Sequence, residues 1–181
     1  MASYSQAMYQ LVADVVEYQS LFFGRHKNIL IIGLNNERQN MERYPNLNYT
    51  ILDKNIEYEK LDFKYYNFIQ CDLNKEFPHL NSKFDLIIGN FILEYIKDKR
   101  EFLANLEKVL SSNGELVLCL WYHNRELDND FKMKLKKYFS KSNLQIYSLK
   151  LFEGENVDEL SLFPKVLQLQ VKGRKNEKIM G

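Results

Sequence analysis

The sequence is poor in glycine, proline and cysteine, and it has no apolar run long enough to cross a membrane. Its 181 residues include 7 Gly, 3 Pro and 2 Cys. Cys71 and Cys119 lack the spacing of a zinc site or a disulfide framework, so we expect reduced, buried thiols in a reducing compartment. Without a membrane span or an apolar N-terminal targeting segment, the chain is expected to be cytoplasmic and to have no membrane partner.

Positive and negative charges are almost equal in number. The chain has 25 Lys and Arg against 24 Asp and Glu, a formal net charge of +1. No global field would therefore draw it to nucleic acid or to a membrane surface. Its length and its 45% of hydrophobic residues suit one globular domain with a sizeable core. We predict a single domain over residues 1–181, with a leading helix within 1–24 and a polar, flexible tail over 172–181.

The segment from Lys83 to Trp121 has the pattern of strand, helix and strand. Two apolar runs, 84–88 and 115–121, are short enough to be strands buried on both faces. Between them apolar residues recur at helical spacing, and Gly114 follows the expected end of the helix. Two buried strands joined by a helix form a parallel pair, and ligands bind at the carboxyl ends of such strands.

The rest of the chain continues the alternation of strands and helices. The expected strands are 28–32, 49–52, 65–70, 84–88, 115–121, 144–150 and 166–171, and further helices are expected over 5–23, 37–44 and 128–139. The last two strands have no helix between them and should pair antiparallel. These features predict an α/β fold with a doubly wound, seven-stranded, mostly parallel sheet and a C-terminal antiparallel hairpin.

Two acids follow predicted strands at the edge where ligands would bind. Asp53 ends the second strand, twenty residues after Gly33. This spacing fits a nucleotide-binding unit in which a carboxylate accepts hydrogen bonds from both ribose hydroxyls. Asp72 follows the third strand. Either acid can instead be a turn or cap residue, because Asp is common in such turns.

The order of these elements resembles the class I S-adenosylmethionine-dependent methyltransferase family. The resemblance covers residues 5–171, and it is strongest over 28–53 and 68–121, where FDLI, LEYI, a helix followed by glycine and an apolar strand come in the family's order. It implies S-adenosylmethionine as the cofactor, with Asp53 on the ribose and Asp72 on the adenine amino group. It also implies that the leading helix packs over the cofactor cleft as a lid.

The glycine-rich turn of that family is incomplete here. The family has D-x-G-x-G-x-G, whereas residues 31–37 read I-I-G-L-N-N-E, which keeps Gly33 and places Asn35 and Glu37 at the next two glycine positions. Asn35 tolerates the left-handed backbone that glycine often adopts. Glu37 brings a negative charge to the start of a helix, where the carboxylate of the methionine half would bind. Alternatively, Glu37 can pair with the cofactor's ammonium group.

Candidates for the acceptor side follow the fourth and fifth strands. Asn90 ends the fourth strand, but Phe91 and Ile92 after it do not match the Asn-Pro-Pro-Tyr turn of family members that methylate nucleobase or glutamine amines. Tyr122 and His123 follow the fifth strand and are the catalytic candidates. Methyl transfer depends on positioning, and a base need only remove the acceptor's proton. An imidazole is suited to that task near neutral pH.

Three functions are compatible with the sequence. The first is a methyltransferase that acts on a small molecule, an RNA or a protein. The second is a catalytically silent methyltransferase-like subunit that serves as a scaffold or activator of a partner, and the third is a nucleotide-binding or other enzyme on the same fold. A protein partner can complete the site in the first two, and lysines in 128–139 give RNA weak support. No metal-ligand cluster is expected, and His26 and His79 have no catalytic groups near them in sequence.

Overall fold

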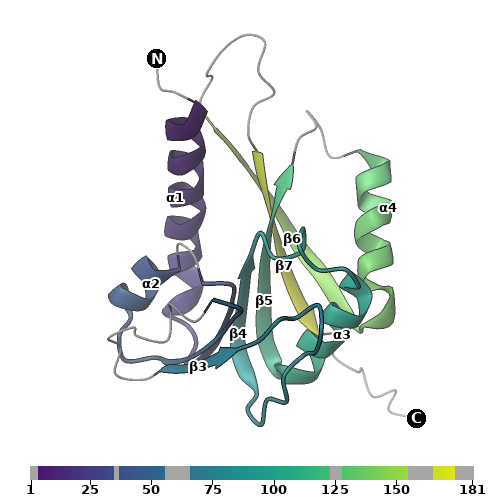
Figure 1. Cartoon of the computed structure of the whole chain (residues 1–181). Coiled ribbons are helices and arrows are strands. Elements are labelled where there is room, and N and C mark those ends of the chain that lie inside the picture. The colour runs from purple at the N-terminus through teal and green to yellow at the C-terminus, as the bar shows by residue number, and fades with distance from the viewer. Residues whose placement is uncertain (1–3, 35–36, 56–65, 123–127, 155–164, 174–181) are drawn as a thin grey trace, which may run out of the picture.

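The computed structural model describes residues 4–34, 37–55, 66–122, 128–154 and 165–173 (Figure 1). The helices are α1 (Tyr4–Phe23), α2 (Arg38–Arg43), α3 (Lys99–Val109) and α4 (Asn129–Tyr138), and the 3-10 turn η2 (Phe139–Lys141) follows α4. The strands are β1 (Asn28–Ile32), β2 (Asn48–Asp53), β3 (Tyr66–Gln70), β4 (Phe84–Asn90), β5 (Leu110–Tyr122), β6 (Leu144–Glu153) and β7 (Lys165–Gly173). No helix in these ranges is long and apolar enough to span a membrane.

The strands form one sheet in the order β3-β2-β1-β4-β5-β7-β6. Strands β1 to β5 pair in parallel, whereas β7 runs antiparallel to both of its neighbours, β5 and β6. The predicted doubly wound sheet with a C-terminal antiparallel hairpin is therefore confirmed. Strand order reverses between β1 and β4, and open α/β sheets bind their ligands at the carboxyl edge of such a switch point.

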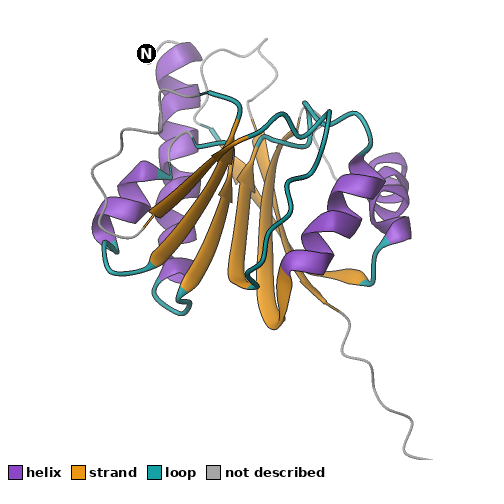
Figure 2. Cartoon of the chain, turned by 60° about the horizontal axis from the view of Figure 1, so that its bottom comes forward, coloured by secondary structure: helices purple, strands orange, loops and turns teal. Residues whose placement is uncertain are grey.

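Helices cover both faces of the sheet (Figure 2). On one face, Leu103 and Leu106 of α3 and Leu135 of α4 pack against the strands. On the other face, Phe23 of α1 and Met41 of α2 form a second core with strand residues. Because both faces are covered, the central strands are apolar on both sides, which is why they read as continuous apolar runs in the sequence.

Helix α1 packs against the end of β5 and the start of β7. Its Leu11 and Val15 pack against Cys119 of β5 and Val166 of β7. In Figure 1 the N-terminal end of α1 lies at the same end of the molecule as the arrowhead of β5. The predicted leading helix thus packs against the carboxyl end of β5.

Strand β5 begins earlier than the sequence predicts. Leu110 directly follows α3 and pairs with Phe84, and the register then shifts before Glu115 pairs with Leu86. A Cβ at Gly114 would lie 2.9 Å from the carbonyl oxygen of Phe84. Gly114 therefore serves a close approach of two strands rather than the end of a helix. At the C-terminus, β7 runs to Gly173, two residues into the predicted tail, and 174–181 lie outside the described residues.

Candidate functional site

The turn after β1 depends on a left-handed glycine. Gly33 has a φ of 74°, and a Cβ placed on it would meet only the Cδ1 atom of Ile92, at 3.8 Å. The backbone conformation, rather than a lack of space, therefore requires glycine at this position. The N–H of Gly33 donates to the carbonyl of Leu52 at 2.8 Å, which holds the turn against the end of β2. Asn35, predicted to continue this site, lies outside the described residues.

Asp53, the last residue of β2, directs its carboxylate to the same turn. One oxygen accepts a hydrogen bond from the N–H of Leu34 at 2.9 Å, and the other accepts one from the N–H of Asn55 at 2.7 Å. A carboxylate has about four acceptor positions, so roughly two remain for the hydroxyls of a ligand. The structure thus brings together Gly33 and Asp53, which the sequence connects only by their spacing.

Asp72 lies beyond the end of β3 and begins a turn. Its carboxylate accepts from the N–H of Asn74 at 3.1 Å, which is the turn-cap role that the sequence left open. Asn74 in turn donates to the carbonyl of Tyr95 at 2.9 Å, so this turn contacts the loop after β4. Burial, together with the negative charges of Asp53 and Asp72, raises the pKa of the intervening Cys71 thiol to about 11. Because the cap uses one oxygen of Asp72, the cap and ligand roles are compatible.

Asn90, the last residue of β4, belongs to a buried polar group that we call the amide cluster, formed by Gln19, Glu37, Asn90, Cys119 and Gln168. The Nδ2 atom of Asn90 donates to Glu37 at 2.7 Å and to Gln19 at 3.0 Å. Gln19 donates back to the Oδ1 atom of Asn90 at 2.8 Å. Glu37 and Gln19 are fully buried, and Asn90 is 9% exposed. The carboxylate of Glu37 is therefore directed at Asn90, inside the protein at the end of β4.

Sequence reasoning missed Gln19. It lies three and four residues after Val16 and Val15, on the stripe of α1 that faces the sheet. A polar amide at an inward position of an amphipathic helix is the signal that could have identified it, because buried polar groups are almost always hydrogen-bonded.

The loop after β4 is fastened to the end of β5. Phe91 has a φ of 58°, a conformation that is rare for a bulky residue. Its N–H donates to the carbonyl of Cys119 at 2.9 Å, and its ring stacks on Trp121 with 4.4 Å between centroids. The carboxylate of Glu94 accepts from the backbone N–H of Trp121 at 2.8 Å. Two half-buried aromatic rings therefore stand at the carboxyl ends of β4 and β5.

The two predicted catalytic residues differ in what the structure says of them. Tyr122 is 2% exposed, and its ring packs edge-on against Phe131 of α4 at 4.9 Å. Successive residues of a strand face opposite sides of the sheet, so Trp121 faces α1 whereas Tyr122 faces α4. The position of Tyr122 is that of a core residue, and its predicted catalytic role gains no support. His123 lies outside the described residues.

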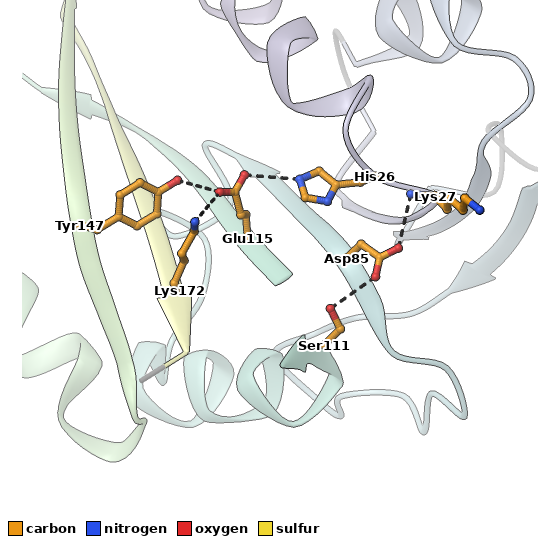
Figure 3. Close-up of polar contacts among 7 residues, drawn as sticks. All are labelled: His26, Lys27, Asp85, Ser111, Glu115, Tyr147 and Lys172. Atoms are coloured by element: carbon orange, nitrogen blue, oxygen red, sulfur yellow. Dashed lines mark hydrogen bonds and ion pairs between the residues drawn. The ribbon is translucent and has the colours of Figure 1, made fainter. Parts of the chain in front are cut away.

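A second polar cluster lies at the opposite edge of the sheet (Figure 3). Glu115, at 8% exposure, accepts from Tyr147 at 3.2 Å and pairs with Lys172 at 3.0 Å and with His26 at 3.3 Å. His26 has no catalytic group near it in sequence, and its partner Glu115 comes from a strand 89 residues further along the chain. Burial acts to raise the pKa of Glu115, but the bonds from Lys172, His26 and Tyr147 outweigh it and hold the pKa below its ordinary value.

The site thus offers acceptors for hydroxyl and amino groups along one edge of the sheet. Asp72, Asp53 and Asn90 follow β3, β2 and β4 in the spatial order of the strands, with the Gly33 turn between the last two. Within the described ranges, no group of three His, Cys, Asp or Glu side chains is arranged to hold a metal ion. Such an arrangement can bind an elongated, hydroxyl-bearing ligand across four strands.

Comparison with known proteins agrees with this geometry. A family model described as a methyltransferase domain matches residues 50–172, more than half of the chain. No curated protein matches the sequence. Similar solved structures include the N-methyltransferase NodS from Bradyrhizobium japonicum, with 16% identity, coverage of 92% of this chain and 98% of that one, and a TM-score of 0.64.

Two further solved structures have the same fold. The plantazolicin methyltransferase BpumL, solved in complex with SAH, is 14% identical, with coverage of 92% of this chain and 85% of that one and a TM-score of 0.63. An S-adenosylmethionine-dependent methyltransferase from Clostridium acetobutylicum is 14% identical, with 92% of each chain covered and a TM-score of 0.61. At these identities the likeness shows the fold.

Proposed function

Since this chain belongs to the methyltransferase domain family and has the class I fold, we propose that it transfers a methyl group from S-adenosylmethionine to an acceptor. The observation that carries the proposal is the contact of the Asp53 carboxylate with the backbone of the Gly33 turn. A carboxylate at the end of β2 beside such a turn is how doubly wound folds hold a ribose. One structural neighbour was solved with SAH, and another is described as S-adenosylmethionine-dependent.

The residues present fit the cofactor. Asp53 would accept hydrogen bonds from the ribose hydroxyls, and the free oxygen positions of Asp72 would accept from the adenine amino group. Only the Cδ1 atom of Ile92 lies within 4 Å of where a Cβ of Gly33 would be, so a ligand could approach the backbone of the turn. Glu37, which Asn90 contacts at the end of β4, would be the partner of the ligand's ammonium group. When bound, S-adenosylmethionine supplies a methyl group on a positively charged sulfur.

On the acceptor side, the chain's contribution is positioning. The stacked rings of Phe91 and Trp121 stand at the edge where an acceptor would enter. We propose a small-molecule acceptor, or a protein partner that completes the site, with His123 as the candidate base. The lysines of α4 keep an RNA acceptor as a minor alternative; Lys132, Lys134, Lys136 and Lys137 are all exposed. An RNA acceptor would bind with strong salt dependence.

Calorimetry with S-adenosylmethionine and S-adenosylhomocysteine tests the cofactor assignment. Asp53→Asn should weaken both ligands by about tenfold to a hundredfold, because hydrogen bonds to a charged group contribute roughly 1.5–3 kcal/mol. The matched control is Asp85→Asn. Asp85 also accepts from two backbone N–H groups, those of Lys27 and Asn28, but it lies at the opposite edge of the sheet. An equal loss of ligand affinity in both variants would contradict a ribose-binding role for Asp53.

A catalytically silent subunit is the second candidate, and the incomplete glycine turn favours it. Such a subunit would show no heat and no thermal stabilisation with either ligand at millimolar concentration. It would instead purify from its source together with a larger methyltransferase. Micromolar binding to the isolated chain would exclude this second function.

A further inference from the structure

One side chain of α1 contacts three strands of the sheet. Gln19 exchanges two hydrogen bonds with Asn90 of β4, at 2.8 and 3.0 Å. Its Nε2 atom also lies 3.3 Å from the Sγ atom of Cys119 in β5 and 3.5 Å from the Oε1 atom of Gln168 in β7. Gln19 is fully buried. A single amide therefore fixes how α1 sits on the strands that end at the crevice.

Glu37 decides which way round the amide of Asn90 stands, and Gln19 pairs with both ends of that amide. In the observed orientation, the oxygen of Asn90 faces the N–H of Gln19, and its nitrogen donates both to Gln19 and to Glu37. A flipped amide would place the oxygen of Asn90 against the carboxylate of Glu37, which is repulsive in a buried setting. Asn90 is thus held between Glu37 and a residue of α1.

Two further contacts join α1 to α2, the helix that begins just after the glycine turn. The Nδ2 atom of Asn40, buried in α2, donates to the carbonyl of Val16 at 2.8 Å. Arg43 forms a two-bond pair with Glu17 at 2.8 and 2.9 Å on the surface. The segment that carries Glu37 is therefore held by α1 as well as by the sheet.

Strand order tells which part of a ligand meets this cluster. If the adenine lies over β3 and the ribose over β2, the rest of the ligand extends past β1 towards the end of β4. There the side chains of Asn90 and Glu37 stand together. The amino-acid end of the ligand would then reach the amide cluster, whereas the adenosine end would not.

We propose that Gln19 is a positioning residue that makes α1 part of the cofactor site: by holding Asn90 and Glu37, it preforms the place of the ligand's amino-acid end. This inference rests on the proposed function. The inference predicts different behaviour for the two halves of one ligand. Binding of the adenosine half should be independent of Gln19, and binding of the amino-acid half should require it.

The test compares two ligands that differ in that half. S-adenosylhomocysteine carries the amino-acid end, and 5′-methylthioadenosine lacks it. Gln19→Met keeps the length of the side chain but can neither donate nor accept the bonds to Asn90. We expect this variant to lower the affinity for S-adenosylhomocysteine roughly tenfold and to change the affinity for 5′-methylthioadenosine by less than about twofold. Calorimetry on the full chain measures both ligands.

The control is Gln170→Met. Gln170 of β7 is also buried and donates to the hydroxyl of Tyr18 in α1, at 3.4 Å, outside the amide cluster. This variant loosens α1 without touching Asn90, so both affinities should stay within about twofold of wild type. If Gln19→Met proves unfolded by circular dichroism, Gln19→Glu replaces it. Glutamate keeps the shape and presents an oxygen to Asn90 where the donor was, so the same split between ligands is expected.

The outcomes are distinct. Weaker binding of S-adenosylhomocysteine, with unchanged binding of 5′-methylthioadenosine, supports the positioning role. Equal weakening of both ligands, or no change in either, overturns it and leaves the proposed function intact. If the wild-type chain binds neither ligand, the proposed function fails and the inference fails with it.

Discussion

The two edges of the sheet each bury a carboxylate, but they do so by different means. At the amino edge, Glu115 is held by Lys172, His26 and Tyr147 (Figure 3). At the carboxyl edge, Glu37 accepts a hydrogen bond from the amide of Asn90, which Gln19 also holds. The first arrangement compensates charge with charge and joins β5, β6 and β7 to the residues before β1. The second arrangement holds a carboxylate and an amide in a fixed relative orientation, and it lies at the strand ends where open α/β sheets bind ligands.

This difference implies that the two edges have different roles, one in stability and the other in ligand binding. A carboxylate paired with a lysine of its own chain contributes to stability, and its contribution depends on pH. A carboxylate oriented by amides contributes to a site whose geometry must be preformed. Changes at the amino edge should therefore alter unfolding and leave ligand affinity alone. Changes at the carboxyl edge should do the opposite.

The largest effect is expected from Glu115→Gln. This substitution removes the charge that Lys172 and His26 face, and it should lower the free energy of unfolding by about 1.5 kcal/mol. The estimate is modest because about half of the Lys172 side chain is exposed. Urea unfolding measures the change, and affinity for S-adenosylhomocysteine should stay within about twofold.

The control for that substitution is Glu42→Gln. Glu42 pairs with Arg38 on the surface of α2, and such exposed pairs contribute only about 0.3–0.5 kcal/mol. If Glu115→Gln weakened ligand binding as strongly as a change in the amide cluster, the two edges would not be separate and the comparison would fail.

The corresponding substitution at the carboxyl edge is Glu37→Gln. Since Glu37 is the candidate partner of the ligand's ammonium group, its loss should weaken S-adenosylhomocysteine about tenfold and leave 5′-methylthioadenosine nearly unchanged. Calorimetry with both ligands gives the ratio. A deaminated analogue of S-adenosylhomocysteine should bind wild type and variant equally well. A variant that binds all three ligands as wild type does would remove Glu37 from the site.

A pH series sharpens the amino-edge side of the comparison. The folded-state pKa of Glu115 lies below its ordinary value of 4.5. Its stabilisation is therefore fully present above about pH 4.5 and is lost as the pH falls through the lower, folded-state pKa. The difference in unfolding free energy between wild type and Glu115→Gln should shrink on acidification below pH 4.5. A difference that is constant with pH would show that Glu115 does not act through its charge.

The two edges also differ in how far the sequence predicted them. Gly33 and Asp53 lie within one strand–helix–strand unit, so their spacing alone indicates that their strand ends meet. His26 and Glu115 are 89 residues apart, and their contact depends on strand order and on the register shift at the start of β5. Periodicity predicts strands and faces, but it does not give the neighbours of a strand. For this reason the fold and the Asp53 turn were predicted, and the amino-edge cluster was not.

Tyr122 shows the other limit of the sequence. Its place near the end of a strand predicted a catalytic position, but successive residues of a strand face opposite sides of the sheet, and the sequence does not say which side Tyr122 faces. The face was decided by the packing of α4, whose Phe131 contacts the Tyr122 ring. Gln19 was missed for the opposite reason, because an inward amide on an apolar stripe reads as an exception to the pattern rather than as a contact.

The smallest effect, and the finest test of the comparison, is expected from two glutamines of β7. Among the described residues, the Nε2 atom of Gln168 is buried and has no hydrogen-bond partner, whereas that of Gln170 donates to Tyr18. Gln168→Met removes an unsatisfied donor and two long contacts, so it should change stability by less than about 0.5 kcal/mol. Gln170→Met breaks a bond and should leave the protein about 0.5–1 kcal/mol less stable than Gln168→Met does. Urea unfolding of the two variants side by side measures this gap. The reverse order would mean that Gln168 is satisfied by ordered water, so that the carboxyl edge is as fully bonded as the amino edge and its amides hold solvent as well as orient Glu37.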